Sequence, residues 1–405
     1  MVVLRWETEF KKTEIGEIPK DWEVKELGRV IKINKKSRNA NKEPVAFISM
    51  ENIPEDGLHP KFEVKNPNEV KSGIEVFPGS LLLAKITPSF EHGKSCIVPK
   101  GNNYKWVATT EVFSILPKDD MVDLLYLFYF FKFPAIREGL QYTMTGTSGR
   151  QRVPKDALVQ LEIPYPPLQE QTRIATVLSW FDDLIENKRK QNEILEKMAM
   201  AIFKSWFIDF EPFQDEEFVY SEELDMEIPK GWEVKKLNSI IEFKYGKGLP
   251  ERKREPGPYP VVGSSGIVGY HSEYLVKGPT VIIGRKGNVG TVQLIAEPNY
   301  PIDTVFYSAP NTPKELVFYI YHYLKLNSPK EVASTDTAVP GLNINLLNLM
   351  DIIIPPQPIL QRFHSLVEPL FQKILLNQKQ ILTLKKIRDT LLPQLVFGRL
   401  RVEKL

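Results

Sequence analysis

The chain has 405 residues, 42% of them hydrophobic and 26% charged, and a formal net charge of +2, which is typical of a globular protein with about two to three domains. No apolar run of about 18 residues occurs, and charged side chains interrupt the first ten residues, which excludes a membrane-spanning helix and a secretory signal. A cytoplasmic location is therefore expected. Cys96 stands alone and the histidines lie far apart, so neither an internal disulfide nor a metal site is predicted.

The first element in chain order is a segment that occurs twice. Residues 17–33, EIPKDWEVKELGRVIKI, return as EIPKGWEVKKLNSIIEF at 227–243, with ten of the seventeen positions identical. A Pro-rich stretch followed by a long apolar-periodic segment also recurs. The chain is therefore predicted to be an internal duplication in which two globular units, residues 1–160 and 215–350, are each followed by one long helix.

Three basic patches lie within these units. Residues 29–42 hold six basic side chains and no acid, residues 139–155 hold three and no acid, and residues 244–254 hold five against Glu251. Each patch alone could be a solvated surface. The first and third, however, follow equivalent copies of the repeated motif, which favours contacts to nucleic-acid phosphates.

Short β-branched and apolar runs predict strands at residues 79–86, 107–115, 279–285 and 290–295. Each unit also has one aromatic-rich segment, at 124–133 and 316–323. Stacking on bases is one interpretation of these rings. Their mixture with Leu, Val and Ile favours a packed core helix instead.

Two apolar seams follow alternating steps of four and three residues, and they match at an offset of 189 positions. The first seam predicts a helix over residues 174–206, which would be ~50 Å long at ~1.5 Å per residue. Two separate core helices are the alternative, but Asn192 and Arg388 within the seams favour a mutual antiparallel coiled coil. Pro393 is expected to end or bend the second helix. The second seam comprises Phe363, Val367, Leu370, Ile374, Asn377, Ile381, Leu384, Arg388, Leu391 and Leu395.

No catalytic motif survives inspection. Residues 92–95 end like a phosphate-binding loop, but Pro88 stands where that motif requires Gly. Gly284, Gly287 and Gly290 have the outer spacing of a dinucleotide fingerprint, yet a strand follows them instead of a helix. The sequence contains no methylase motif, nuclease carboxylate cluster or Ser/His/Asp arrangement that we can identify. The chain is predicted not to be an enzyme.

Residues 166–212 resemble the central region of type I restriction-modification specificity subunits, and residues 390–402 resemble the C-terminal region of that family. Residues 81–95, 260–270 and 282–290 are similar to its target-recognition domains. The resemblance spans the chain. It implies an α+β fold with two β-rich target-recognition domains, joined by two long antiparallel helices that form a coiled coil in a pseudo-twofold duplication.

The implied domains are target-recognition domain 1 (1–163), helical region 1 (164–212), target-recognition domain 2 (213–354) and helical region 2 (355–405). The resemblance also implies that each recognition domain reads one half of a bipartite duplex DNA target. Two methyltransferase subunits, which would use S-adenosylmethionine, and restriction subunits are the expected partners; no cofactor is expected in this chain. Because residues 355–363 lack the pair Glu170-Gln171, the two docking surfaces are expected to differ.

Clustered cations and hydroxyls on loops are the candidates for DNA contacts, since such groups bind phosphates and base edges. Lys85 and Arg285 are the foremost candidates because each follows an apolar strand in its own repeat. The base-proximal set is Lys85, Thr87, Lys94, Arg150 and Arg152 in the first unit, with Lys247, Ser264, Ser265, Arg285 and Lys286 in the second. The phosphate-contacting set is Lys35, Lys36, Arg38, Arg252 and Lys253.

Phe203, Trp206 and Phe207 end the first helix and are candidates for partner binding, unless the rings pack on the chain's own second domain. Two other functions compete with DNA specificity. One is a coiled-coil adaptor whose end domains bind protein or nucleic acid. The other is an autonomous DNA-modifying enzyme, which the missing motifs disfavour.

Overall fold

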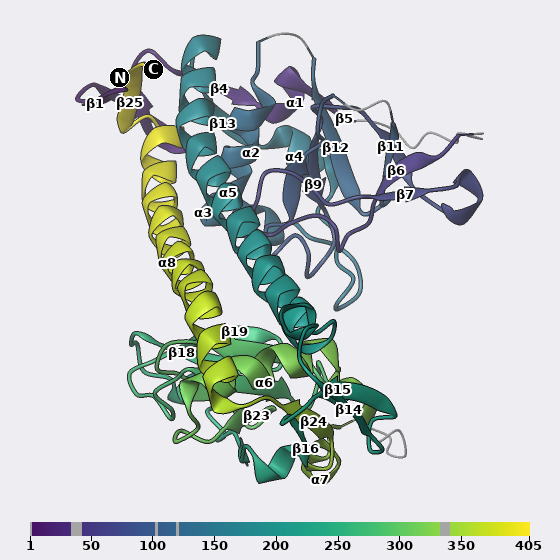
Figure 1. Ribbon diagram of the computed structural model, residues 1–405. Helices are drawn as coiled ribbons and strands as arrows, with labels where there is room; N and C mark the ends of the chain where they lie inside the picture. Colours follow the sequence, from purple (N-terminus) through teal and green to yellow (C-terminus); the bar gives the residue numbers. More distant parts are fainter. Residues whose placement is uncertain (1, 34–42, 102–103, 119–120, 333–340) are drawn as a thin grey trace. The chain divides into compact units, whose positions relative to one another are not determined.

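The structure is a computed structural model that describes residues 2–33, 43–101, 104–118, 121–332 and 341–405. It divides into two compact units: unit 1 comprises Met1–Lys188 and Gln380–Leu405, and unit 2 comprises Arg189–Lys379. Two long helices, α5 (Leu168–Phe207) and α8 (Gln357–Val396), appear in teal and yellow in Figure 1. The division falls within both helices, so each helix contributes to both units.

Unit 1 contains two four-stranded sheets with the orders β10-β9-β12-β5 and β7-β6-β11-β8 (Figure 1). Strand β9 serves two cores because its side chains alternate: Leu81 and Leu83 join the main core, and Leu82 joins a smaller core around Trp106. The strands are β5 (Ile31–Ile33), β6 (Val45–Ile48), β7 (Glu63–Lys65), β8 (Ile74–Val76), β9 (Leu81–Ala84), β10 (Ser95–Ile97), β11 (Lys105–Ala108) and β12 (Val112–Pro117).

The strand predicted at residues 79–86 is confirmed as β9, whereas the single strand predicted at 107–115 is wrong. Strand β11 ends at Ala108, and β12 begins at Val112 in the other sheet. Thr109 lies in the turn, where its Oγ1 accepts a hydrogen bond from the Glu111 amide at 3.4 Å. The β-branched residues Thr109 and Thr110 extend the apolar run into the turn, so the run did not reveal the change of sheet.

The aromatic-rich segment at 124–133 forms the core helix α2 (Leu124–Lys132). Asp123 caps its first turn by accepting hydrogen bonds from the amides of Leu125 and Tyr126. The Tyr126 hydroxyl donates to the carbonyls of Pro164 and Val396, at 3.1 and 3.2 Å, and so ties α2 to strand β13 (Glu162–Tyr165) and to the end of α8. The other short helices of unit 1 are α1 (Leu27–Val30), α3 (Pro134–Gln141) and α4 (Lys155–Gln160).

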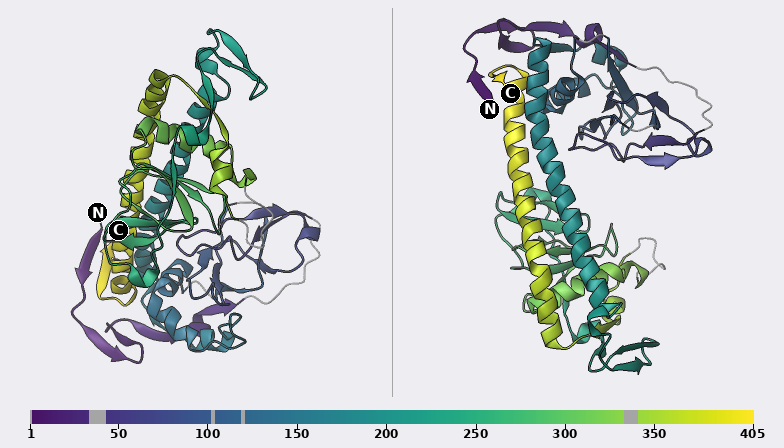
Figure 2. Two further views of the ribbon diagram at one scale, coloured as in Figure 1. Left: turned by 90° about the horizontal axis from the view of Figure 1, so that it is seen from below. Right: turned by 45° about the horizontal axis from the view of Figure 1, so that its top comes forward.

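The two ends of the chain pair in unit 1, where β1 (Val3–Trp6) runs antiparallel to β25 (Leu400–Lys404); Figure 2 shows the two ends side by side. Arg401 secures this pairing through Glu7 at 2.6 Å and Glu170 at 2.5 Å. Two further strand pairs belong to the unit: β2 (Phe10–Thr13) with β3 (Gly16–Pro19), and β4 (Glu23–Glu26) with β13 (Glu162–Tyr165).

Unit 2 repeats this plan with a four-stranded sheet, β17-β23-β20-β21, and a three-stranded sheet, β19-β18-β22. The predicted strands at 279–285 and 290–295 and the core helix at 316–323 are confirmed as β20 (Thr280–Gly284), β21 (Val292–Ile295) and α6 (Lys314–Leu326). The remaining elements are β14 (Phe218–Ser221), β15 (Met226–Pro229), β16 (Glu233–Lys236), β17 (Phe243–Tyr245), β18 (Tyr259–Gly263), β19 (Gly266–His271), β22 (Tyr300–Pro301), β23 (Val305–Ser308), α7 (Ile344–Asn348) and β24 (Asp351–Ile354).

Short 3-10 turns connect these elements: η1 (Pro67–Glu69), η2 (Glu211–Phe213), η3 (Leu237–Ser239), η4 (Glu251–Lys253) and η5 (Pro329–Val332).

The two long helices pack against each other within each unit. In unit 1, Arg388 contacts Asp182 at 2.5 Å, and in unit 2, Asn377 donates to Asn192 at 2.9 Å. Asp182 precedes Asn192 along α5, whereas their partners Arg388 and Asn377 come in the opposite order along α8. The paired helix segments are therefore antiparallel. Arg388 and Asn192, the two polar seam positions singled out in the sequence, thus have different partners.

Both helices have 40 residues. Pro393 is expected from the sequence to end or bend α8, and the first alternative is wrong, because α8 continues through Pro393 to Val396. Proline in a helix interior costs about 3 kcal/mol because it removes one hydrogen bond and crowds the preceding turn. Leu392, Leu395 and Val396 are all buried in the main core of unit 1, and that burial offsets the cost. No helix in the described part of the chain is long and apolar enough to cross a membrane.

Candidate nucleic-acid interface

In unit 2, the residues that follow β20 meet the turn of residues 301–304. The amides of Arg285 and Lys286 both donate to the Thr304 carbonyl, at 2.9 and 3.2 Å. The Ser264 amide donates to Thr304 Oγ1 at 3.4 Å, and the Lys247 amide donates to the Pro301 carbonyl at 3.0 Å. Four predicted DNA-binding residues are therefore brought together around one turn, and Ser265 adjoins Ser264.

The Arg285 side chain is held in place by two neighbours. Its Nη1 donates to the Asp303 carbonyl at 3.2 Å, and its guanidinium carbon lies 5.0 Å from the centre of the Tyr245 ring. Tyr245 is 53% exposed, so one guanidinium face is covered by an aromatic ring that solvent also reaches. The sequence reasoning did not name Tyr245, although an aromatic residue within the basic patch 244–254 was a usable signal.

In unit 1, an equivalent arrangement follows β9. The Lys85 amide donates to the Glu111 carbonyl at 3.1 Å, and its carbonyl accepts from the Val153 amide at 2.9 Å. In unit 2 the Arg285 carbonyl accepts from the Leu342 amide at 3.0 Å, and Leu342 stands 189 positions after Val153. The two foremost candidates, Lys85 and Arg285, therefore occupy equivalent places in the duplicated fold.

Arg152 and Thr87 lie beside Lys85. Glu111 binds the Arg152 guanidinium through two hydrogen bonds, at 2.8 and 2.9 Å, which orients it rigidly. The Thr87 amide donates to the Gln151 carbonyl at 2.9 Å, and the Thr87 side chain is buried. Arg150 is exposed, and its carbonyl accepts from Arg152 at 3.1 Å. The patch at 139–155 is thus folded against the end of β9.

The remaining predicted DNA contacts lie elsewhere. The Lys94 ammonium donates to the Met50 carbonyl at 2.9 Å and ties two loops of unit 1 together. Arg252 and Lys253 lie exposed on η4. Lys35, Lys36 and Arg38 fall outside the described residues.

The three rings predicted to bind a partner are buried in the core of unit 2. Phe203, Trp206 and Phe207 have 0%, 9% and 2% exposure. Phe207 packs edge-on against Phe363 at 5.0 Å and lies 5.8 Å from Trp232, measured between ring centres. This is the alternative considered from the sequence, in which the rings pack on the chain's own second domain, and it corrects their assignment to a docking surface.

Glu170 and Gln171, the pair missing from the second copy, also face inward. Glu170 accepts a hydrogen bond from Trp22 Nε1 at 3.1 Å, and Gln171 accepts from the Asp123 amide at 2.9 Å. In unit 2 the Trp232 indole N–H is buried without an acceptor among the described residues. The pair therefore satisfies polar groups inside unit 1, and its absence leaves the equivalent tryptophan unsatisfied.

Exposed apolar side chains do occur on α5. Trp180 and Leu184 are 42% and 49% exposed in unit 1, and Ile194 and Met198 are 57% and 48% exposed in unit 2. Each pair is spaced by four residues, so its members lie on one face of the helix. Across the described ranges, no group of three or more His, Cys, Asp or Glu side chains could hold a metal ion.

A sequence model of the type I restriction modification DNA specificity domain matches residues 19–197 and 229–386. The type I restriction enzyme MjaIX specificity subunit of Methanocaldococcus jannaschii is 40% identical, covering 100% of this chain and 99% of that protein. The MjaVIII specificity subunit of the same organism is 26% identical over 98% of this chain and 97% of that protein.

A solved S subunit of a type I restriction-modification system from M. genitalium has a TM-score of 0.54 at 22% identity, covering 93% of this chain and 96% of that one, which supports the fold. The two family matches coincide with the two copies of the internal repeat. The chain therefore belongs to the type I restriction-modification DNA specificity subunits, and its role is sequence recognition and not catalysis.

Proposed function

We propose that each unit of this chain reads one half of a bipartite duplex DNA target, with Arg285 and Lys85 as the principal base-contacting residues. The observation that carries this proposal is the equivalent placement of two cations at the ends of β9 and β20, each fixed by main-chain hydrogen bonds. Long cationic side chains on fixed backbone can reach acceptors on base edges in the major groove. Arg150, Arg152, Lys247, Ser264, Ser265 and Lys286 flank them and contribute base or phosphate contacts.

The catalytic steps belong to partner subunits. We infer that two methyltransferase subunits dock on the exposed apolar faces of α5, one at Trp180 and Leu184 and one at Ile194 and Met198. S-adenosylmethionine is bound by those subunits, and restriction subunits join the same complex in the cytoplasm. Exposed large apolar side chains, one turn apart, are typical anchors of protein interfaces.

The decisive experiment compares the purified chain alone with the chain plus its methyltransferase subunits. The chain alone should bind duplex DNA weakly and neither methylate nor cleave it. Added methyltransferase should restore methyl transfer at a split motif, identified by sequencing methylated genomic DNA from cells with and without this chain. Methylation by the rigorously purified chain alone, or an unchanged methylation pattern after its deletion, would contradict the proposal.

A further inference from the structure

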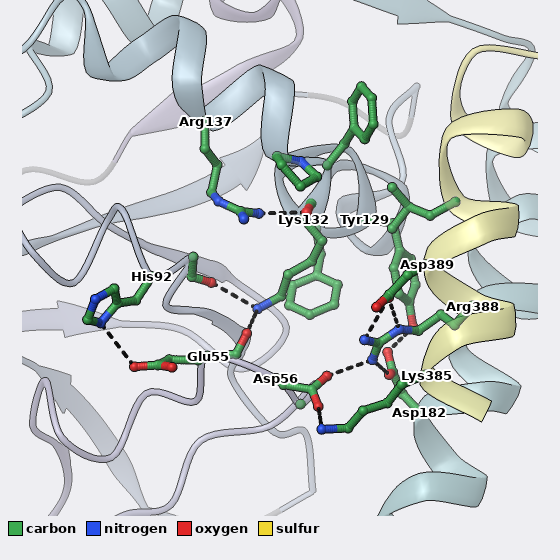
Figure 3. Close-up of a pocket in the computed structure, with 16 residues that line it drawn as sticks. Glu55, Asp56, His92, Tyr129, Lys132, Arg137, Asp182, Lys385, Arg388 and Asp389 are labelled. Atoms are coloured by element: carbon green, nitrogen blue, oxygen red, sulfur yellow. Dashed lines mark hydrogen bonds and ion pairs between the residues drawn. The ribbon is translucent and has the colours of Figure 1, made fainter. Parts of the chain in front are cut away.

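Unit 1 contains a cavity of about 550 Å³, and none of the residues predicted to contact DNA lines it. Lys132 of α2 and Arg137 of α3 lie on one side of it, and Lys385 and Arg388 of α8 lie on the other, as Figure 3 shows. A cavity of this size is within the range of about 300–1,000 Å³ that is typical of small-molecule sites.

The carboxylates on the α8 side are all ion-paired. Asp56 contacts Lys385 Nζ at 2.6 Å and Arg388 Nη1 at 2.7 Å. Asp182 contacts Arg388 at 2.5 Å and accepts a hydrogen bond from the Tyr129 hydroxyl at 2.6 Å. Glu55 also lines the cavity, and its carboxylate pairs with His92 at 3.2 Å. In the described part of the chain, no ion pair joins any of these acids to Lys132 or Arg137 on the opposite wall.

On that opposite wall, the hydrogen bonds that Lys132 and Arg137 make to described residues all go to main-chain carbonyls. Lys132 Nζ donates to Glu55 at 2.8 Å and to Gly93 at 3.0 Å, which leaves one ammonium N–H unused. Arg137 Nη1 donates to the carbonyls of Phe131 and Lys132, while its buried Nε has no acceptor in the part of the chain described. Burial lowers the pKa of both groups, that of Lys132 to about 8, although the negative charge of Asp56 opposes the shift at Lys132 and that of Glu138 opposes it at Arg137.

Unit 2 provides an internal comparison. The Tyr126 hydroxyl donates to the Pro164 carbonyl and the Tyr319 hydroxyl donates to the Ile353 carbonyl, and these two acceptors are 189 positions apart. The two tyrosines are therefore equivalent, and so are Lys132 and Lys325, because each lysine stands six residues after its tyrosine. Lys325 likewise donates to a main-chain carbonyl, that of Val292, at 3.3 Å.

The side chain that faces this lysine differs between the units. In unit 2, two cavities are each lined by both Glu196 and Lys325. Burial raises the pKa of Glu196, and the positive charge of Lys325 opposes that rise. The position 189 residues after Glu196 is Lys385, so unit 1 places a cation where unit 2 has a carboxylate. At this position the first cavity is therefore more positive than its counterparts in unit 2.

We propose that the cavity in unit 1 binds a small phosphate-bearing anion, held by Lys132 and Arg137 with Lys385 on the opposite side. The Lys132 ammonium and the Arg137 guanidinium on one wall, with the Lys385 ammonium opposite, point to a ligand with several acceptor oxygens, and phosphate offers these together with charge. The phosphate can come from a free small molecule or from a DNA backbone, and the two sources are separable by experiment.

The test uses the full-length chain and two probes, inorganic pyrophosphate and a random-sequence duplex, measured by calorimetry at constant ionic strength. Lys385→Glu copies the arrangement of unit 2 and should weaken binding of pyrophosphate, or of the duplex if a backbone phosphate is the ligand, at least tenfold. Lys386→Glu, an exposed neighbour on α8 with the same charge change, is the matched control and should stay within about twofold of the unaltered chain.

Loss of pyrophosphate binding in Lys385→Glu, with duplex binding equal to that of the control, supports a free anion as ligand. Selective loss of duplex binding supports a backbone phosphate as ligand. Equal behaviour of Lys385→Glu and Lys386→Glu with both probes overturns the proposal. If Lys385→Glu does not fold, Lys132→Met serves instead, with Lys325→Met as its matched control in unit 2 and the same outcomes deciding.

Discussion

At the scale of single residues, both the backbone and the side chain of Arg285, which follows β20, are held in place by neighbouring groups of the chain. Its amide and its guanidinium both bind the turn of residues 301–304, and Tyr245 covers one face of the guanidinium. Fixing a long side chain in advance reduces the conformational entropy lost on binding. These contacts support the proposal that Arg285 reads a base and does not only contact a phosphate.

Arg285→Ala should cost about 1 to 3 kcal/mol in binding to the target and relax discrimination within one half-site only. Tyr245→Leu should cause a smaller loss of the same kind, because it removes the support of Arg285 but not its charge. Competition binding with duplexes altered in one half-site measures both effects, with Lys230→Ala, a surface lysine paired to Glu217, as control. Equal loss on specific and random DNA would identify Arg285 as a phosphate contact.

Glu7 gives unit 1 a specific acid sensitivity. Burial alone would raise its pKa, but hydrogen bonds from the Glu9 and Thr8 amides and the Arg401 guanidinium lower that pKa to about 2. Because the folded pKa is below the unfolded value of about 4.5, Glu7 stabilises the fold fully above that pH, and the stabilisation is lost as pH falls towards 2.

Glu7→Gln should therefore lower the melting temperature at neutral pH and flatten its fall between about pH 4.5 and pH 2. Melting curves followed by circular dichroism across this range provide the measurement. Glu14→Gln, a change at an exposed glutamate of the same terminal region, should leave the curve unaltered. An equally steep acid transition in Glu7→Gln would exclude this carboxylate as a source of the pH dependence.

At the scale of elements, a polar contact interrupts the apolar seam between α5 and α8 in unit 2. Asn377 is fully buried and donates to Asn192 at 2.9 Å and to Gln191 at 3.3 Å. A buried polar pair of this kind can set helix register at some cost in stability, because sliding either helix strands both amides in an apolar layer.

Asn377→Leu alone should lower the free energy of unfolding by about 1 to 3 kcal/mol, since it leaves the Asn192 amide without its buried partner. The double variant Asn192→Leu with Asn377→Leu should regain most of that loss. Chemical denaturation of the two single variants and the double variant gives the coupling energy directly. Additive effects would mean that the two amides do not depend on each other.

The proposed docking of partner subunits depends, at this scale, on which face of α5 is exposed. Trp180→Ala should weaken co-purification with methyltransferase at least tenfold and leave the melting temperature unchanged, because the ring is 42% exposed. Phe207→Ala should do the reverse, losing about 3 to 5 kcal/mol of stability from a filled core. Pull-downs and melting curves on both variants test this contrast, and an unaffected complex with Trp180→Ala would remove this face from the interface.

At the scale of the whole molecule, helix length is the candidate for what separates two half-sites. Each 40-residue helix has a length of ~60 Å at ~1.5 Å per residue, whereas half-sites one to one and a half turns apart on DNA require ~34 to 54 Å. Deleting residues 188–194 and 377–383 removes one heptad from each helix and keeps both seams in phase.

This double deletion should shorten each helix by ~10 Å, equivalent to roughly 3 base pairs, so the half-site sequences should persist with a shorter spacer. Sequencing of methylated genomic DNA measures the spacer directly. A folded complex that still methylates only the original spacing would assign the separation to the connections between sheets and helices instead.

The sequence by itself determined the repeats of this molecule: the duplicated motif, the two long helices, the aromatic core helices and the strand ends that carry Lys85 and Arg285. These features follow from periodicity and internal similarity, which are local properties of a chain. The family resemblance rested on the same segments. The sequence also suggested Pro393 as an end of α8, which is wrong. The free energy gained by burying the side chains around Pro393 exceeds the local cost of a proline in a helix.

Which side chains meet depends on how the elements pack and could not be predicted from the sequence. The tertiary structure placed Phe203, Trp206 and Phe207 inside unit 2, turned Glu170 and Gln171 towards the interior of unit 1, and set Tyr245 against Arg285. It also opposed Lys132 to Lys385 across a cavity, although the two are far apart in the sequence. The physical reason is that the heptad pattern predicts only which face of a helix is apolar. The neighbours of every other face depend on which distant segments of the chain pack against it.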